Sequence, residues 1–268
     1  MSGEPADATP QDAGYRQLAR AVLVREFLIF VRYPANAIGG IVIALFFFGL
    51  LFYGGRMIAG RALTDSLEGI IVGYFLWTLS VGAYSAISND IASEVQWGTL
   101  ERHVMTPFGF APVALLKGVA KLARTFLTSA VILAVMLLVT GTTLKLNVLT
   151  VVTVATLSIV SVLGLGFAVG GITILYKRVS NWLNLLQFGF IVLISAPALD
   201  LGWARFLPLA HGSELLQRAM IDGVRLWEFS PVDLLILVGT AVGYLAVGYA
   251  VFQYTTRRAR RLGVLGDY

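Results

Sequence analysis

The chain alternates between long runs of uncharged residues and short polar segments. Six runs contain no Asp, Glu, His, Lys or Arg and are each at least 20 residues long. They cover residues 33–55, 69–89, 125–144, 146–176, 179–199 and 234–256. Because a helix needs roughly 20 residues to cross a bilayer core about 30 Å thick, each run predicts a membrane-spanning helix. We therefore expect an all-α membrane protein with six transmembrane helices.

The fourth run is longer than one crossing requires. Its 31 residues would form a helix of about 46 Å, so we expect the helix either to project from the bilayer or to begin late in the run. Glycines four residues apart let helix backbones approach closely, either inside one bundle or between subunits. This spacing occurs at Gly69 with Gly73, Gly166 with Gly170, and Gly239 with Gly243.

The segments outside these runs predict accessory elements. Residues 1–14 are polar and suggest a disordered tail, whereas residues 15–33 mix Arg with apolar side chains and suit a helix at the membrane interface. Residues 203–229 combine aromatic residues, charges, Gly and Pro, which predicts short external helices that are re-entrant or interfacial. Within them, Ser213 is a candidate N-cap for a helix from Glu214 to about Asp222.

The distribution of basic residues predicts the orientation. An even number of spans puts both termini on one side, and 14 of the 20 Lys and Arg residues then lie on that side. The positive-inside rule makes this side cytoplasmic, so we expect a multi-pass protein of the cell membrane with both termini in the cytoplasm. The basic tail, residues 257–268, belongs to this excess. The asymmetry accounts for the net charge of +5 without a nucleic-acid partner.

Composition agrees with a chain that is mostly in lipid. Hydrophobic residues make up 57% and charged residues 13% of the sequence, and the mean hydropathy is +0.81. Soluble domains average about half apolar and a quarter charged residues. The absence of Cys excludes disulfides and thiol ligands.

The sequence offers little catalytic chemistry. The six runs contain no ionisable Asp, Glu, His, Lys or Arg for an ion or proton relay. No lysine lies in the Gly-x-x-x-x-Gly-Lys-Ser/Thr pattern of a nucleotide-binding loop. His103 and His211 are assigned to opposite sides of the membrane and are expected to be surface or interfacial residues, so no metal site is predicted. Energy for active transport would then come from another chain.

Residues 94–107, Glu-Val-Gln-Trp-Gly-Thr-Leu-Glu-Arg-His-Val-Met-Thr-Pro, form a charged segment between the second and third runs. Gly98 offers a break, and Thr99 is a plausible N-cap for a short helix. Pro107 and Pro112 then delimit the loop before the third span. The pattern suits either a solvated loop with helical turns or a cytoplasmic element held by a partner protein.

The run Glu94-Val-Gln-Trp-Gly-Thr-Leu-Glu101, followed by Met105-Thr-Pro107 and Lys117, resembles the cytoplasmic loop of type 2 ABC transporter (ABC-2) permeases. The resemblance covers almost the whole chain, with a transmembrane domain at 15–256 that includes an interfacial helix at 15–33 and a coupling helix at about 94–106. It implies that the coupling helix binds a separate ATPase. The implied contacts are Glu94, Gly98, Thr99, Leu100, Glu101, Arg102 and Met105, with a second candidate contact at Arg25 and Glu26.

The resemblance also implies the partners and the transport mechanism. Two permease subunits, identical or homologous, would pair with ATPase subunits that bind ATP and Mg, while this chain binds no cofactor. The complex would export a drug-like, glycolipid or polysaccharide substrate along the first, second and fifth spans. Aromatic residues either line this path or face lipid and core; the candidates are Phe47, Phe48, Tyr74, Trp77 and Tyr84.

Two other function classes remain open from the sequence. A secondary transporter or channel would work without an ATPase, and a membrane-bound enzyme would work without transport.

Overall fold

The computed structural model describes residues 34–59, 67–96, 110–175, 180–199 and 202–261, together with single positions between 17 and 32. No strand occurs within these ranges. The long helices are α2 (Pro34–Ala59), α3 (Leu67–Gln96), α5 (Phe110–Thr140), α6 (Val148–Leu175), α7 (Ser180–Ser195) and α9 (Pro231–Arg261). Short elements lie between α7 and α9, namely η3 (Ala196–Leu199), η4 (Ala204–Phe206), α8 (Ala210–Gln217), η5 (Arg218–Asp222) and η6 (Leu226–Glu228).

Four of the described helices are long and apolar enough to cross a membrane. Their apolar segments are Leu67–Asn89, Gly118–Thr140, Val148–Leu175 and Pro231–Ala259, in α3, α5, α6 and α9. The first and fifth runs coincide with α2 and α7, whose apolar segments Ile38–Gly54 and Leu185–Ser195 are shorter than 18 residues. The described chain is thus a helical membrane protein with four candidate spans, and the count of six stays a prediction.

The helix boundaries settle where α6 begins, and they show that the predicted position of Pro112 in the loop before the third span is wrong. α6 begins at Val148, two residues into its run, and extends for 28 residues, so this helix is long and does not begin late. α5 begins at Phe110, which places Pro112 inside its first turn and not in the preceding loop. Proline is tolerated there because the first N–H groups of a helix have no partner within the helix.

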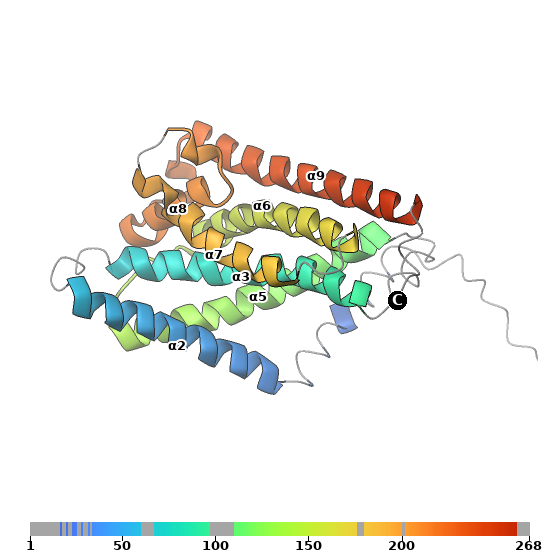
Figure 1. Ribbon diagram of the computed structural model, residues 1–268. Coiled ribbons are helices and arrows are strands. Elements are labelled where there is room, and N and C mark those ends of the chain that lie inside the picture. Colours follow the sequence, from blue (N-terminus) through green and yellow to red (C-terminus); the bar gives the residue numbers. More distant parts are fainter. Residues whose placement is uncertain are drawn as a thin grey trace, which may run out of the picture.

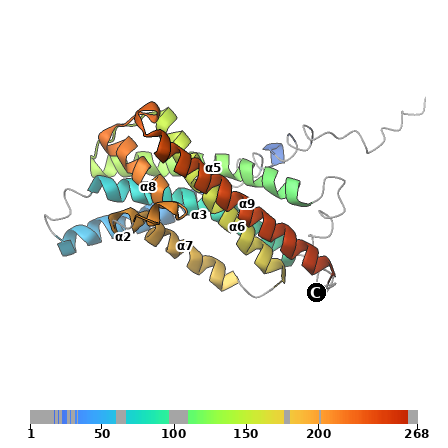
Figure 2. The ribbon, with the colours of Figure 1, turned by 90° about the horizontal axis from the view of Figure 1, so that it is seen from above.

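The long helices run roughly along a common direction and alternate in sense (Figures 1 and 2). The beginning of α2, the end of α3, the beginning of α5 and the end of α9 lie toward one end of the bundle. The short elements around α8 lie at the opposite end (Figure 1). This arrangement is the one expected for spans that cross a membrane alternately.

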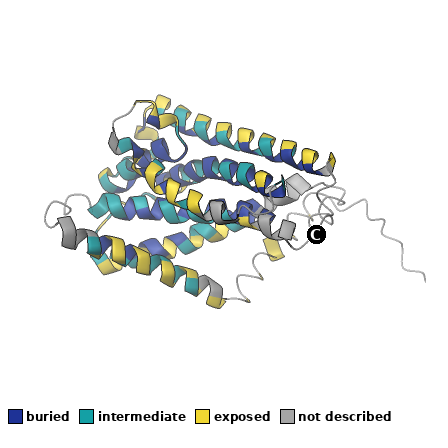
Figure 3. Ribbon diagram, viewed as in Figure 1, coloured by how far each residue is buried: buried dark blue, intermediate teal, exposed yellow. Residues whose placement is uncertain are grey.

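α3 and α6 form the interior of the bundle. Their apolar segments are 61% and 56% buried, against 28% for α5 and 17% for α9. In Figure 3 the buried residues follow α3 and α6, whereas exposed residues follow α2 and the outer side of α9. Large apolar side chains on the outside, such as Leu138 at 82% and Leu235 at 73% exposure, have no reason to face water and are expected to contact lipid.

The glycine pairs have different roles. A Cβ atom on Gly166 or Gly170 would meet atoms of Tyr84, Ile87 or Ile91 in α3, so this pair packs α6 against α3. Gly73 faces Ile194 of α7 at 3.6 Å, and Gly69 lies near Gln217. Gly239 and Gly243 of α9 meet nothing within 4 Å in the described structure. Two of the three pairs therefore serve packing inside the bundle.

α9 begins with a local signal that needs no tertiary contact. The Ser230 hydroxyl accepts a hydrogen bond from the backbone N–H of Val232 at 3.3 Å, Pro231 is the first helical residue, and Asp233 supplies a negative charge in the first turn. Each feature is favourable at a helix N-terminus. These local features determine where α9 begins along the chain.

Candidate functional site

A cavity of about 610 Å³ lies between α2, α3, α5 and α7, within the size range of small-molecule sites. The α3 residues on its wall follow the spacing of one helix face: Tyr74, Trp77, Thr78, Val81, Gly82, Ser85 and Ala86. The α5 residues do the same: Lys121, Arg124, Thr125, Thr128, Ser129 and Ile132. α2 contributes Gly40, Ile41, Ile43, Ala44 and Phe47, and α7 contributes Gln187 and Phe188.

Aromatic contacts close the cavity where α2 meets α3. The Tyr74 hydroxyl donates a hydrogen bond to the carbonyl oxygen of Ala44. The Tyr74 ring lies 5.3 Å from the ring of Phe48 and 5.3 Å from that of Trp77. Phe48 in turn contacts Phe52 at 5.3 Å. Such offset or tilted pairs are favourable, so this end of the cavity has a firm apolar wall.

Hydrogen bonds hold α7 against α3. The indole N–H of Trp77 donates to the carbonyl oxygen of Gln187 at 3.1 Å. The amide of the same Gln187 donates from Nε2 to the Ser85 hydroxyl at 3.3 Å. Polar groups in an apolar environment are costly when unpaired. These two bonds provide partners for the Trp77 indole N–H, the Gln187 amide and the Ser85 hydroxyl.

The opposite wall joins α3 to α5. The Thr78 hydroxyl donates to the Ser129 hydroxyl at 3.3 Å. One turn further along α3, a Cβ atom on Gly82 would lie only 2.3 Å from Cγ2 of Thr125. Glycine at this position allows the two helices to approach closely without displacing the Thr125 side chain.

Among the described residues that line the cavity, the charged side chains lie on α5. Lys121 and Arg124 lie in the first half of this helix, and Lys121 Nζ donates to the carbonyl oxygen of Ala86 at 3.4 Å. Among the described residues that line the cavity there is no carboxylate. The end near Lys121 and Arg124 carries basic and polar side chains, while the end near Phe47 and Tyr74 is aromatic.

The five aromatic residues predicted for the substrate path fall into two groups. Phe47, Tyr74 and Trp77 line the cavity. Phe48 and Tyr84, which are 3% and 0% exposed, belong to the core of the bundle. Tyr84 packs edge-on against Phe190 of α7, with 5.5 Å between ring centroids.

Sequence reasoning missed the polar lining of α5 and Gln187. A usable signal was present, because Lys121, Thr125, Thr128 and Ser129 recur at helical spacing in an otherwise apolar helix. The sequence did not indicate that α2 and α7 would complete the enclosure.

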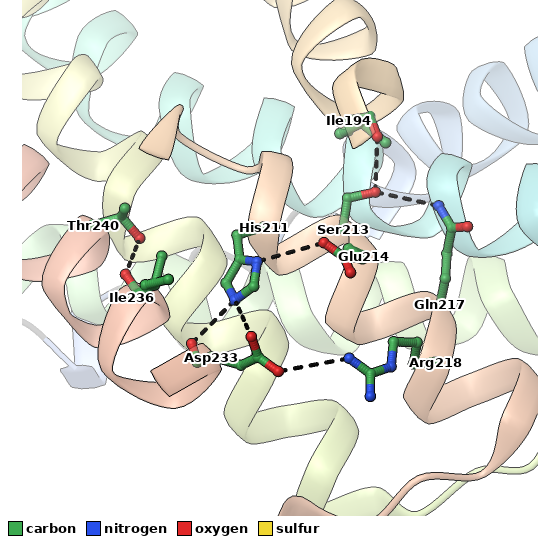
Figure 4. A network of polar contacts seen from close by, with 9 residues as sticks. All are labelled: Ile194, His211, Ser213, Glu214, Gln217, Arg218, Asp233, Ile236 and Thr240. Atoms are coloured by element: carbon green, nitrogen blue, oxygen red, sulfur yellow. Dashed lines mark hydrogen bonds and ion pairs between the residues drawn. The ribbon is translucent and has the colours of Figure 1, made fainter. Parts of the chain in front are cut away.

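The segment between α7 and α9 forms a second polar cluster (Figure 4). His211 of α8 is 4% exposed, so the expectation of a surface histidine is wrong. Its Nε2 donates to the carbonyl oxygen of Asp233 at 3.1 Å, because a carbonyl oxygen can only accept. Its Nδ1 lies 3.6 Å from a carboxylate oxygen of Glu214. Arg218 approaches the Asp233 carboxylate at 3.7 Å, so the cluster ties α8 and η5 to the start of α9.

The predicted cap at Ser213 is also wrong. α8 begins at Ala210, after Leu209 in a left-handed conformation with φ 68°. Ser213 lies inside this helix, and its hydroxyl donates to the carbonyl oxygen of Ile194 at 2.9 Å, as Figure 4 shows. A Cβ atom on the neighbouring Gly212 would lie 1.9 Å from the Ser158 hydroxyl oxygen. Packing against α7 and α6 therefore decides where this helix begins.

The predicted ATPase-coupling residues are described only in part. Glu94 belongs to the last turn of α3, which extends to Gln96. The others lie outside the described residues, namely Gly98, Thr99, Leu100, Glu101, Arg102 and Met105. Arg25 is helical and exposed, whereas Glu26 lies outside the described positions.

Acidic and histidine side chains can hold a metal ion where three or more come together. Throughout the described ranges, no three His, Asp or Glu side chains come together in a way that would hold a metal ion. The cavity offers an aromatic wall, hydroxyl and amide groups and basic side chains at one end, which is chemistry for binding a molecule.

Comparison with known proteins identifies the family. The family model described as ABC-2 type transporter matches residues 17–221, which is more than half of the 268 residues. No curated protein matches the chain in a sequence search. The matched region begins before α2 and ends within η5, so it includes every helix that lines the cavity. The chain therefore belongs to the ABC-2 type transporter family and is a transmembrane permease component.

Proposed function

We propose that this permease exports an amphipathic or lipid-linked substrate from the cytoplasm by coupling to a separate ATPase subunit. The observation that carries the proposal is the family match across residues 17–221, together with the lack of a nucleotide-binding loop in the whole sequence. A permease that has no ATP site of its own and performs active transport requires a partner that has one.

The coupling element in this proposal is the segment at about 94–106. α3 extends to Gln96, and a helix of 30 residues would be about 45 Å long, longer than a bilayer core about 30 Å thick. The end of α3 would then project from the membrane and carry the following residues toward the ATPase. Leu100 and Met105 would pack against the partner, and Glu101 and Arg102 would make polar contacts.

In the working complex, two permease subunits would pair with two ATPase subunits that bind ATP and Mg. ATP-driven closure of the ATPases would move the coupling segment and, through α3, the walls of the cavity. Phe47, Tyr74 and Trp77 line this cavity, so movement of α3 against α2 would change its shape. The same movement would open a route toward the outside.

Purification from native membranes tests the proposal. We expect the tagged permease to copurify with a subunit that contains a nucleotide-binding loop, and to transport only when ATP is hydrolysed. A purified permease that transports at full rate without such a subunit would be a secondary transporter or channel. A chain that converts a substrate chemically without moving it would be an enzyme, and either result would overturn the proposal.

A single substitution tests the coupling segment. Glu101→Ala should leave the permease folded but reduce ATPase binding or coupled turnover by about tenfold, as expected for the loss of one interfacial charge contact worth about 1–2 kcal/mol. Glu68→Ala is the matched control, because Glu68 lies in the first turn of α3, at the opposite end of the helix. Equal coupling in the two variants would remove Glu101 from the proposed role.

A further inference from the structure

We infer that the cavity between α2, α3, α5 and α7 receives one linear hydrocarbon chain of the exported substrate, which enters from the bilayer and lies along Tyr74 and Trp77. This assignment rests on the proposed function and deepens it, because it names the substrate class as a molecule with a linear apolar chain. The site lies inside one permease subunit.

The cavity is elongated along the helix axes. The lined face of α3 extends from Tyr74 to Ala86, and that of α5 extends from Lys121 to Ile132. At 1.5 Å per residue these faces are about 18 Å and about 16 Å long. A sphere of 610 Å³ would be only about 10 Å across, which is shorter than either face. A long, narrow space between neighbouring helices suits an extended hydrocarbon chain better than a compact or polycyclic molecule.

The cavity opens toward the outer surface of the bundle. Its floor is buried, with Ile132 at 5% and Tyr74 at 7% exposure. Its rim is exposed and apolar, with Ile43 at 59%, Phe47 at 53% and Phe188 at 62% exposure. Since the outer surface of a membrane-spanning bundle faces lipid, the opening leads into the bilayer. A ligand that enters there must itself partition into the membrane.

Aromatic rings from three helices supply the contact surface. The rings that line the cavity are those of Phe47, Tyr74, Trp77 and Phe188. A hydrocarbon chain that moves from lipid into this cavity gains no hydrophobic free energy, because both surroundings are apolar. Its affinity therefore depends on dispersion contacts with a closely packed wall, and aromatic side chains offer large surfaces for such contacts.

Hydrogen-bond donors on the wall are engaged with the protein itself. Several donate to backbone carbonyl oxygens, namely the hydroxyls of Tyr74, Thr78 and Thr128, the indole N–H of Trp77 and the ammonium group of Lys121. A ligand along this wall therefore meets mainly the carbon surfaces of these side chains. Because hydrogen-bonding groups are costly to bury without partners, the wall favours a hydrocarbon chain over a polar molecule.

Tryptophan fluorescence offers a direct measurement, because Trp77 lies in the cavity wall. The test uses a permease in which Trp97, Trp182, Trp203 and Trp227 are replaced by Phe, reconstituted into phosphatidylcholine nanodiscs without ATP or ATPase. The quencher is dibrominated octadecanol, an uncharged molecule with a linear hydrocarbon chain. We expect quenching of Trp77 to saturate at a mole fraction of quencher about tenfold lower than the bulk lipid would need for the same quenching.

A lipid-facing position provides the reference for bulk lipid. Leu138 lies on α5 outside the cavity and is 82% exposed. A permease whose single tryptophan is introduced by Leu138→Trp, with Trp77→Phe, should be quenched in proportion to the amount of quencher, without saturation.

Two neighbouring glycines of α2 give a matched pair of variants. Gly40 lines the cavity and Gly39 does not, and a Cβ atom on either meets nothing within 4 Å. Gly40→Phe should weaken the saturable quenching about tenfold, because its ring occupies space that the hydrocarbon chain needs. Ala44→Phe, one turn further along the same wall, should do the same. Gly39→Phe should retain the quenching, and circular dichroism checks that all three variants fold.

Three results of the binding experiment would overturn the site. These are quenching of Trp77 that does not saturate, saturable quenching that survives both Gly40→Phe and Ala44→Phe, and loss of saturable quenching in Gly39→Phe as well. A dibrominated sterol should not quench Trp77 saturably. Binding of the sterol at the same mole fraction as octadecanol would overturn the assignment of a linear hydrocarbon chain.

The assignment as cargo is tested in the complex with its ATPase. The dibrominated octadecanol should stimulate ATP hydrolysis, and the stimulation should be lost in Gly40→Phe and retained in Gly39→Phe. If no ATPase copurifies while saturable binding at Trp77 holds, the proposed function fails and the site stands. If the ATPase is coupled but Trp77 shows no saturable quenching, the inference fails and the function stands. Binding without stimulation identifies a resident bilayer lipid and overturns the assignment as cargo.

Discussion

Two glycines set the distance between α6 and α9. A Cβ atom on Gly164 would lie 2.1 Å from the carbonyl oxygen of Tyr244, and one on Gly248 would lie 1.9 Å from the carbonyl oxygen of Gly164. Both obstructing atoms belong to the backbone, which cannot move aside as a flexible side chain can. The close packing of these helices therefore depends on the absence of side chains at two positions.

This contact predicts that replacing glycine by alanine in α9 has a different effect on stability at different positions. Gly248→Ala should lower the free energy of unfolding by about 1–3 kcal/mol, the usual cost of overpacking. Gly243→Ala, also on α9, meets nothing within 4 Å and should be neutral or stabilising by up to about 1 kcal/mol, because alanine favours helix more than glycine does. Unfolding in mixed micelles, followed by circular dichroism, measures both. Equal effects at the two positions would contradict the observed crossing.

The polar cluster around His211 contains a hydrogen bond of 3.1 Å to the Asp233 carbonyl oxygen and ion pairs of 3.6 to 3.8 Å. His211→Ala removes the bond to the Asp233 carbonyl and leaves a space in a buried site, so we expect a loss of about 2–3 kcal/mol. Asp233→Ala keeps that carbonyl and removes only a partly exposed carboxylate in the first turn of α9, at about 1 kcal/mol. Asp222→Ala, at an exposed position, should change stability by less than about 0.5 kcal/mol. A reversed order in denaturation measurements would show that the ion pairs dominate.

At the scale of whole elements, the charge-free runs predict the long helices well. A backbone segment surrounded by lipid must satisfy its N–H and C=O groups internally, so an apolar run of sufficient length has little alternative to a helix. α8 does not follow from this argument. Its N-terminus depends on the left-handed Leu209 and on contacts of Gly212 and Ser213 with distant helices, and no local pattern encodes these contacts.

The packing of α3 against α5 is open to a chemical test, because the chain contains no cysteine. The hydroxyl oxygens of Thr78 and Ser129 lie 3.3 Å apart, so small movements would bring two sulfur atoms to the disulfide distance of about 2.0 Å. Thr78→Cys with Ser129→Cys should therefore lose both free thiols on mild oxidation, measured by the gel shift of a maleimide-polymer label. Thr78→Cys with Leu138→Cys is the control, since Leu138 is 82% exposed. Retention of both thiols in the first pair would contradict the packing of these helices.

At the scale of the whole molecule, the cavity shows what the sequence leaves undetermined. Helical spacing identifies the polar face of α5 and the aromatic face of α3 separately. Which faces meet depends on the relative positions of α2, α3, α5 and α7, and these follow from close contacts such as Gly82 with Thr125. The relative positions of the helices also place two of the five predicted path residues, Phe48 and Tyr84, in the core. Aromatic composition alone does not distinguish a cavity wall from a packed interior.

The orientation of the whole molecule in the membrane is predicted from the distribution of basic residues and from which helix ends lie at each end of the bundle. The beginning of α2 and the end of α9 lie at one end of the bundle, and α8 and η5 lie at the other (Figure 1). The positive-inside rule assigns the first end to the cytoplasm. We therefore expect Arg261→Cys, at the end of α9, to react with a membrane-impermeant maleimide only after the cells are permeabilised. Asp222→Cys, an exposed position in η5, should react in intact cells.

The cysteine-free parent chain controls for background labelling in this experiment, and Gln17→Cys provides a second position expected on the cytoplasmic side. Gln17 is exposed and helical and precedes the first span, so an even number of spans requires it to behave as Arg261→Cys does. Labelling of Arg261→Cys but not of Asp222→Cys in intact cells would invert the orientation and, with it, the direction of transport. Opposite behaviour of Gln17→Cys and Arg261→Cys would mean an odd number of crossings, and one of α2 and α7 would then fail to span the membrane.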